Sequence, residues 1–205
     1  PTLGNTQDFG DLNDHTGRPA ATSSTTRAIC VGGFQSPALR DILQFVTIAS
    51  IGNATDFGDL TLARNQLGAF SNQVRGIAMG GNPETNLMDF HTISTTGNAQ
   101  DFGDMIENGN VSASGSSSTR RIYAGGGETD ANSNTISFIT IATKGNAENF
   151  GDLTQAVGNC SGTSSQVRFV RAGGRTPSLT DVIDFVTIAT TGDATDFGDI
   201  TQARR

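Results

Sequence analysis

Pairs of acidic residues recur at a fixed spacing along this 205-residue chain. Each pair flanks a Phe-Gly dipeptide within the phrase Gly-Asn/Asp-Ala/Thr-x-Asp/Asn-Phe-Gly-Asp. The phrase occurs five times, and we number its copies motifs 1 to 5: residues 4–11, 52–59, 97–104, 145–152 and 192–199. Clustered carboxylates suit hard cations such as Ca²⁺, so a repeated metal site is the first chemistry to consider.

An arginine recurs as well, five residues before each of four Gly-Gly pairs: Arg27, Arg75, Arg120 and Arg168. A guanidinium can bind a carboxylate through two parallel hydrogen bonds. Positions three apart in a strand point to opposite faces, so one aspartate of a pair would cap a turn and the other would face a neighbouring sheet. The sequence lacks the spacing of a calcium-binding loop. We therefore predict a repeated Arg–Asp ion pair and no metal site.

Catalysis finds little support in the sequence. His15 and His91 are the only histidines and occupy unrelated positions in the repeat. Cys-x-x-Cys, His-Glu-x-x-His and Gly-x-Ser-x-Gly do not occur. Two carboxylates about 5–9.5 Å apart could serve a glycosidase, but an arrangement present in every repeat favours a structural role. We predict a non-enzymatic protein with no catalytic residues and no cofactor.

The elements that carry these residues follow a regular period. The motif phenylalanines are separated by 48, 45, 48 and 47 residues, which is typical of solenoid turns or propeller blades. Gly-Gly pairs follow a motif phenylalanine by 23 residues, and another phenylalanine precedes the next motif phenylalanine by 12. These recurring rings are nine of the twelve phenylalanines, and we expect them to pack between successive sheets.

Each period contains four strand candidates, which we call A to D. Examples are residues 67–72 and 111–116 for A, 75–79 and 120–124 for B, and 42–49 and 182–189 for C, while the repeated phrase forms D. Strand C is rich in β-branched and aromatic residues and apolar on both faces, as in a strand between neighbouring sheets. The predicted units span residues 19–61, 67–106, 111–154 and 160–201, and residues 4–12 form a lone outer strand.

Two resemblances accompany this pattern. The order Ile77-Ala78-Met79-Gly80-Gly81, then Phe90 and Phe102, with an Arg-containing turn such as 60–64, is similar to the kelch repeat. The wording of residues 185–199 is similar to repeat-containing structural proteins of tailed phages, notably phages of marine cyanobacteria. The first resemblance implies a β-propeller, and the second implies a virion or extracellular location.

We therefore expect an all-β, kelch-like β-propeller with four complete four-stranded blades and one extra N-terminal strand. The lone strand has no strands A to C of its own in the sequence. Either the blades form part of a larger ring, or the exposed edge of the lone strand pairs with another chain to give a homo-oligomer.

Composition excludes two classes of partner. The formal net charge is −7 and Lys144 is the only lysine, so the chain lacks the basic surface by which proteins bind nucleic acid or anionic membranes. No apolar run approaches the roughly 20 residues that a membrane-spanning helix needs.

Recognition is expected on the loops that vary. Length varies only in the B–C loops, which are residues 34–40, 82–86, 127–134 and 175–180. They share a face with the D–A loops because neighbouring strands alternate in direction. We predict a structural or binding module of a phage tail, fibre or decoration protein, with other virion proteins or a host-surface glycan or protein as partners. The alternatives are a polysaccharide-acting enzyme and a lectin-like module. The candidate binding residues are Gln35, Arg40, Arg64, Asn65, Asn82, Glu84, Glu128, Asp130, Asn132 and Arg175.

Overall fold

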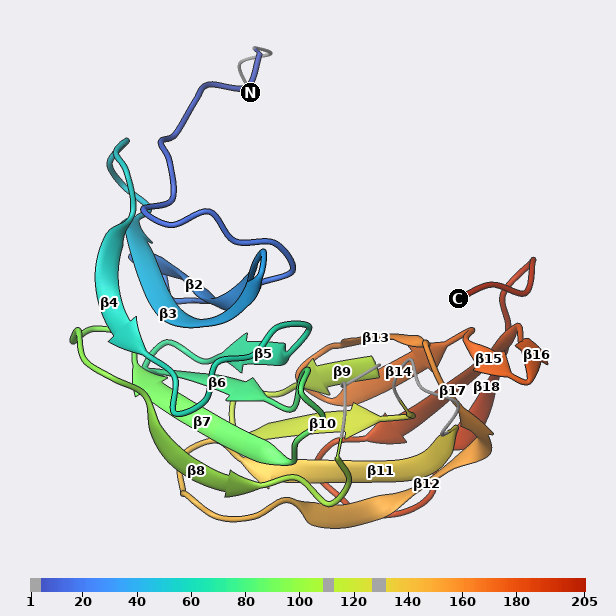
Figure 1. Ribbon diagram of the computed structural model, residues 1–205. Coiled ribbons are helices and arrows are strands. Elements are labelled where there is room, and N and C mark those ends of the chain that lie inside the picture. Colours follow the sequence, from blue (N-terminus) through green and yellow to red (C-terminus); the bar gives the residue numbers. More distant parts are fainter. Residues whose placement is uncertain (1–4, 109–112, 127–131) are drawn as a thin grey trace.

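The computed structural model describes residues 5–108, 113–126 and 132–205. The regular secondary structure of these ranges consists of eighteen β-strands, and sixteen of them form four antiparallel four-stranded sheets. The sheets follow one another along an open arc, with the N-terminal and C-terminal segments at its two ends (Figure 1). They do not close a ring. The described ranges contain no helix long and apolar enough to cross a membrane.

The four sheets follow the chain order and are numbered accordingly. Sheet 1 contains β1 (Ala20–Ser23), β2 (Arg27–Gln35), β3 (Ala38–Thr47) and β4 (Thr55–Asp59). Sheet 2 contains β5 (Gly68–Ser71), β6 (Arg75–Met79), β7 (Leu87–Thr92) and β8 (Gln100–Asp104). Sheet 3 contains β9 (Ala113–Ser116), β10 (Arg120–Ala124), β11 (Ser133–Thr140) and β12 (Glu148–Val157). Sheet 4 contains β13 (Ser161–Ser164), β14 (Arg168–Ala172), β17 (Val182–Thr187) and β18 (Thr195–Asp199). A separate hairpin contains β15 (Arg175–Thr176) and β16 (Ser178–Leu179).

The predicted four-strand unit is confirmed in each sheet, with differences at the loops. Strands β6 and β10 have the predicted bounds, whereas β3 begins at Ala38 rather than at residue 42. Residues 34–40, expected as a loop, are the tip of a hairpin in which Phe34 pairs with Leu39 and Gln35 with Ala38. Of the strand expected over 111–116, the described part is β9, and residues 111–112 lie outside the described ranges.

The expectation that the two acidic residues of a motif face opposite ways is wrong, because the motif contains a β-bulge. In sheet 1, Asp56 lies opposite Gln44 and Asp59 lies opposite Ile42, so Phe57 is the additional residue. Partners two apart on one strand share a face, and the bulge therefore places both aspartates on one side. The register shifts at the same place in the other three sheets.

The repeated motif joins each sheet to the one before it. In the contact between sheets 1 and 2, Gly97 N donates to Phe57 O at 2.7 Å and Ala99 N donates to Asp59 O at 2.7 Å. The side chain of Asn98 accepts a hydrogen bond from the backbone nitrogen of Asp59 at 3.1 Å. The same three bonds link motifs 1 and 2, motifs 3 and 4, and motifs 4 and 5. The phrase is therefore a repeated connector between sheets.

The hydrophobic core consists of three clusters, one at each contact between sheets. Phe57, Phe102 and Phe150 each lie in one cluster and are 2% exposed. Each also packs edge to face against the phenylalanine of strand C in its own sheet. Their burial in these clusters confirms that these three rings pack between sheets. Burial of a ring of this size stabilises a fold by roughly 1.5–3 kcal/mol.

The predicted ion pair between the recurring arginines and the motif aspartates is not formed among the described residues. Instead, Arg120 lies over the ring of Phe138 in its own sheet, 4.6 Å from the ring centroid. Its Nη1 donates to the carbonyl oxygens of Ile188 and Ala189 in the next sheet, at 3.1 and 3.0 Å. Arg27 and Arg75 make equivalent contacts with the sheets that follow them. These arginines thus bind backbone carbonyl oxygens across the contacts between sheets.

Two other Arg–Asp pairs are fully buried, one in sheet 2 and one in sheet 4. Arg64 Nη2 lies 2.8 Å from Asp89 Oδ2, and Thr61 Oγ1 donates to Asp89 Oδ1 at 2.6 Å. Arg171 pairs with Asp184, whose other oxygen accepts from Thr154 Oγ1 at 2.6 Å. In both sheets a threonine of the preceding sheet completes the carboxylate's hydrogen bonding, so each pair also connects two sheets.

His91 lies buried between sheets 1 and 2, with its Nε2 2.9 Å from Thr22 Oγ1. Burial lowers the pKa of His91 from 6.5 to about 4. Between these values the unfolded chain binds a proton that the folded chain does not, so stability is complete above pH 6.5 and falls as the pH drops toward 4. We expect a loss of about 3 kcal/mol between pH 7.5 and pH 4, measured by urea unfolding.

A His91→Gln variant, which can still bond to Thr22, is the control for this prediction. Its stability should vary less over the same pH interval than that of the parent protein. Equal pH dependence in the two proteins would show that other groups cause the acid sensitivity.

The N-terminal segment differs from the expected lone strand. Residues 5–12 form no strand, although Phe9 O and Asp11 O accept from Gly52 N and Ala54 N. The segment thus accepts the hydrogen bonds by which motif 2 connects to it, but no strand in the described residues pairs with it to form a sheet. Phe9 is consequently 37% exposed, against 2% for its counterpart Phe57.

Candidate functional site

In the described residues, the loops of sheets 1, 2 and 4 lie in pairs, as expected for B–C and D–A loops that share one face, which we call the loop face. Backbone bridges join Gly17 to Phe34, Asn65 to Asn82 and Gly158 to Arg175. In each case a residue that leads into a sheet pairs with one from the B–C loop of that sheet. The loop face is therefore a set of paired loops, each held by backbone hydrogen bonds.

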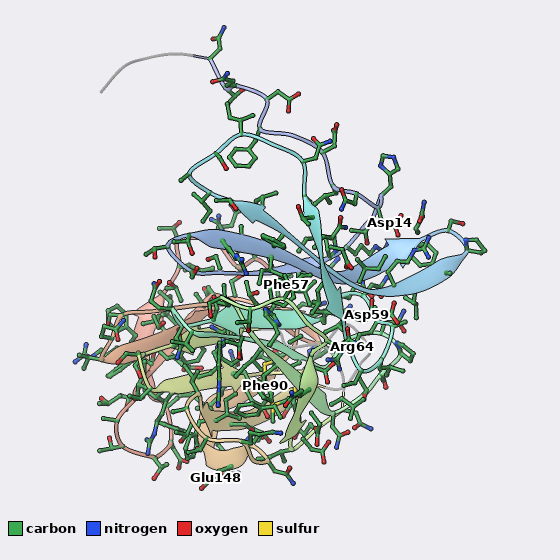
Figure 2. The ribbon with its side chains drawn as sticks, turned by 90° about the vertical axis from the view of Figure 1, so that its left-hand side faces the viewer. Asp14, Phe57, Asp59, Arg64, Phe90 and Glu148 are labelled. Atoms are coloured by element: carbon green, nitrogen blue, oxygen red, sulfur yellow. The ribbon has the colours of Figure 1, made fainter. Side chains whose placement is uncertain are left out.

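Several predicted binding residues serve this pairing or the sheet contacts. Asn65 and Asn82 exchange backbone hydrogen bonds of 3.1 and 2.8 Å; Asn65 is buried and Asn82 is exposed. Arg64 is fully buried, where its Nη1 and Nη2 donate to Leu87 O and Asp89 of sheet 2. Figure 2 shows Arg64 inside the molecule and Asp14 near the outer end of sheet 1. Arg64 thus contributes to the interior, and Asn82 contributes to the loop surface.

A hollow of about 440 Å³ opens where the N-terminal segment crosses the β2–β3 hairpin. Phe34 and Gln35 line it from the hairpin, and Asp11 and His15 line it from the segment. Phe34 is 38% exposed, so an aromatic surface stands beside carboxylate, imidazole and amide groups. These are groups that can fix the orientation of a polar ligand.

Charged side chains hold the rim of this hollow. Arg40 Nε lies 3.3 Å from Asp14 Oδ2, and an Arg40 nitrogen donates to Gln35 Oε1. The ion pair ties the hairpin to the N-terminal segment, although both side chains are partly exposed and such pairs typically contribute under about 1 kcal/mol. The structure therefore brings together two predicted residues, Gln35 and Arg40.

The remaining predicted residues lie elsewhere. Arg175 is exposed on the β15–β16 hairpin, where its Nε donates to Pro177 O at 2.9 Å. Glu84 and Asn132 are exposed in the B–C loops of sheets 2 and 3. Glu128 and Asp130 lie outside the described residues. The predicted residues thus spread along the loop face; Gln35 lines the hollow, and Arg40 is bonded to Gln35.

The motif carboxylates are placed for structure more than for a ligand. Asp8, Asp101 and Asp196 each accept a hydrogen bond from the backbone nitrogen of the glycine two residues later. The pKa of Asp59 is raised, first by partial burial and then by the carboxylates of Asp41 and Asp56. In the described part of the chain, no three His, Cys, Asp or Glu residues gather as a metal site would require.

Sequence reasoning missed the connector role of the residue that follows the first motif glycine. Asn53, Asn98, Asn146 and Asp193 each accept a hydrogen bond from the motif before them. The signal was present, because this position is Asn or Asp in every motif. Sequence reasoning also missed Phe34 and His15, because neither residue has a counterpart of the same type in the other repeat units.

No family model and no curated protein matches this sequence.

Proposed function

We propose that the four sheets are blades of a kelch-like β-propeller arc, and that the arc is a non-enzymatic binding module. The observation that supports this best is the pairing of B–C and D–A loops on one face. Rigid sheets carry these loops, the B–C loops differ from unit to unit in length and residues, and such loops commonly carry recognition. The connector bonds repeated between sheets lie in the motifs and outside these loops, so changes in the loops leave the scaffold unaltered.

The ligand class that best fits the hollow is a glycan. Phe34 offers an aromatic face for the apolar side of a sugar ring, and Gln35, His15 and Asp11 offer hydrogen-bonding groups for its hydroxyls. The resemblance of the repeated phrase to tailed-phage proteins favours a tail, fibre or decoration component that binds a host-surface glycan. Detection of the protein on purified particles by immunogold electron microscopy tests that setting.

Replacement of Phe34 and Gln35 by alanine should weaken glycan binding by at least about tenfold, since buried aromatic anchors commonly contribute more than 1 kcal/mol. The measurement is binding to an array of bacterial capsule polysaccharides and lipopolysaccharides, followed by calorimetry on any hit. Leu179→Ala, on an exposed loop-face residue away from the hollow, is the matched control.

Equal glycan binding by the variant with alanine at positions 34 and 35 and by the Leu179→Ala control would contradict a glycan site at the hollow. Release of new reducing ends from a bound polysaccharide would favour the alternative, a polysaccharide-acting enzyme on the same scaffold.

A further inference from the structure

The fourth sheet exposes groups that are buried wherever two sheets meet within the chain. Phe197 is 58% exposed, whereas Phe57, Phe102 and Phe150 are 2% exposed. At the four earlier motifs, a Cβ added to the second glycine would lie 2.4–2.5 Å from an atom of the next motif, whereas a Cβ added at Gly198 would have no such neighbour within 4 Å. The outer surface of sheet 4 thus exposes the same groups that sheets 1 to 3 each bury against the sheet that follows them.

The first sheet exposes the opposite half of such a contact. Ile48, just after β3, is 45% exposed, while its counterparts Ile93, Ile141 and Ile188 are 1%, 1% and 2% exposed. Those counterparts are covered by the preceding sheet, whose arginine bonds to their carbonyl oxygens. Arg168 of sheet 4 is the fourth of these arginines and is exposed. The two ends of the arc therefore present complementary sets of groups.

A two-sheet alternation in the sequence also matches sheet 4 to sheet 1. Sheets 1 and 3 read Ser-x-Thr/Ser-Thr-Arg at residues 23–27 and 116–120. Sheets 2 and 4 read Ser-x-Gln-Val-Arg at residues 71–75 and 164–168. A sheet of the first type is therefore the one that should follow sheet 4, and sheet 1 is of that type. The contact between sheets 2 and 3, where a sheet of the first type follows one of the second type, is therefore the model for a contact between sheet 4 and sheet 1.

We propose that sheet 4 of one copy packs against sheet 1 of a second copy, with β18 in the place of that copy's residues 5–12. Phe197 and Asp199 correspond to Phe9 and Asp11, so their carbonyl oxygens would accept from Gly52 N and Ala54 N of the second copy. The side chain of Asn53 would accept from Asp199 N, as it does from Asp11 N within one chain.

The strand of sheet 4 makes the better partner for sheet 1. Residues 5–12 form no strand and leave Phe9 and Leu12 37% and 40% exposed. Strand β18 is already ordered within a sheet, and it brings Arg168 toward the carbonyl oxygens that follow β3. Only the exchanged arrangement covers Ile48 and Phe197 together.

Two such contacts close a ring of two copies. The contact is heterologous, and a heterologous contact forms a closed ring when its rotation permits. Two four-sheet arcs give eight sheets, within the four to eight blades that are typical of propellers. This step depends on the propeller arrangement proposed above.

Sedimentation equilibrium over a range of concentrations tests the proposal. We expect the parent chain to reach twice its mass of 21.3 kDa. Ile48→Glu places a charge in the contact and should weaken pairing by at least about tenfold. Val167→Glu is the matched control, because Val167 is 61% exposed and its counterpart Val74 stays 58% exposed beside a following sheet.

The two end phenylalanines separate strand exchange from other contacts. Phe197→Ser should reduce pairing, whereas Phe9→Ser should leave it unchanged or increase it, because residues 5–12 compete with β18. A single-copy mass at every concentration, equal loss with Val167→Glu, or loss with Phe9→Ser would overturn the proposal. Residues 10–12, which β18 would replace, also line the hollow. Glycan binding is therefore measured separately on the Ile48→Glu variant, so that failure of one proposal is distinguishable from failure of the other.

Discussion

Asp89→Ala should destabilise the protein by about 3–5 kcal/mol, because it leaves Arg64 buried without its counter-charge. Arg64 is 0% exposed, and burial already lowers the pKa of its guanidinium while Asp89 opposes that shift. The variant also removes the acceptor of Thr61 Oγ1, so the bonds of Arg64 and of Thr61 to this carboxylate are lost together. Urea unfolding followed by circular dichroism gives the measurement, because the chain has no tryptophan.

A double variant tests whether the uncompensated charge is the cause. Arg64→Met combined with Asp89→Ala removes both charges, and apolar replacement of a buried pair is often neutral or stabilising. We expect the double variant to recover most of the loss. Sheet 3 already has a neutral residue, Ser137, at the position of Asp89. A loss below about 1 kcal/mol for Asp89→Ala would contradict the described pair.

The repeat made most of the fold predictable, because its invariant intervals fix the order of the strands. The glycine pairs located β6 and β10, the β-branched and aromatic run of strand C located β17, and the motif phenylalanines identified the contacts between sheets. The ends of the elements were less predictable. Residues 34–40 carry Gln35, Ser36 and Pro37, which are typical of a loop, yet their neighbours continue the ladder to the turn.

Two errors about the repeated charges have one physical origin. The sequence pattern assumes a regular strand, in which residues three apart face opposite ways. The bulge at each motif phenylalanine changes that relation, so Asp56 and Asp59 share a face. The arginines were assigned carboxylate partners because opposite charges recur together, whereas the structure places backbone carbonyl oxygens nearer to Arg75 and Arg120. A pattern of side chains does not reveal which backbone groups lie exposed at the end of a strand.

The hollow could be anticipated only in part. The length variation of the B–C loops directed attention to Gln35, which lines the hollow, and to Arg40, which is bonded to Gln35. Its other wall comes from Asp11 and His15, in a segment that the sequence assigns to a different unit. Contact between that segment and the hairpin follows from the order of the sheets along the arc, which is a property of the assembled fold.

Gly103→Ala should destabilise the protein far more than Gly198→Ala, although both glycines occupy the same place in the motif. Both have a positive φ, +140° and +133°, so both substitutions carry a comparable backbone strain of about 1–2 kcal/mol. A Cβ at position 103 would lie 2.4 Å from the carbonyl oxygen of Gly145, and nothing lies within 4 Å at position 198. We expect an additional loss of about 2–4 kcal/mol for Gly103→Ala, from overpacking and from strain on the connector bonds.

The comparison is made by urea unfolding at concentrations where a single copy predominates. Equal losses would show that φ strain alone sets the need for glycine, and that contact between successive motifs contributes little. The same two positions also bear on pairing of copies, since Gly198 would meet Gly52 of a second chain as Gly10 meets Gly52 within one chain. Gly198→Ala should therefore cost little in the single copy and much in the pair. That difference would mark Gly198 as the motif glycine whose close neighbour is supplied by another molecule.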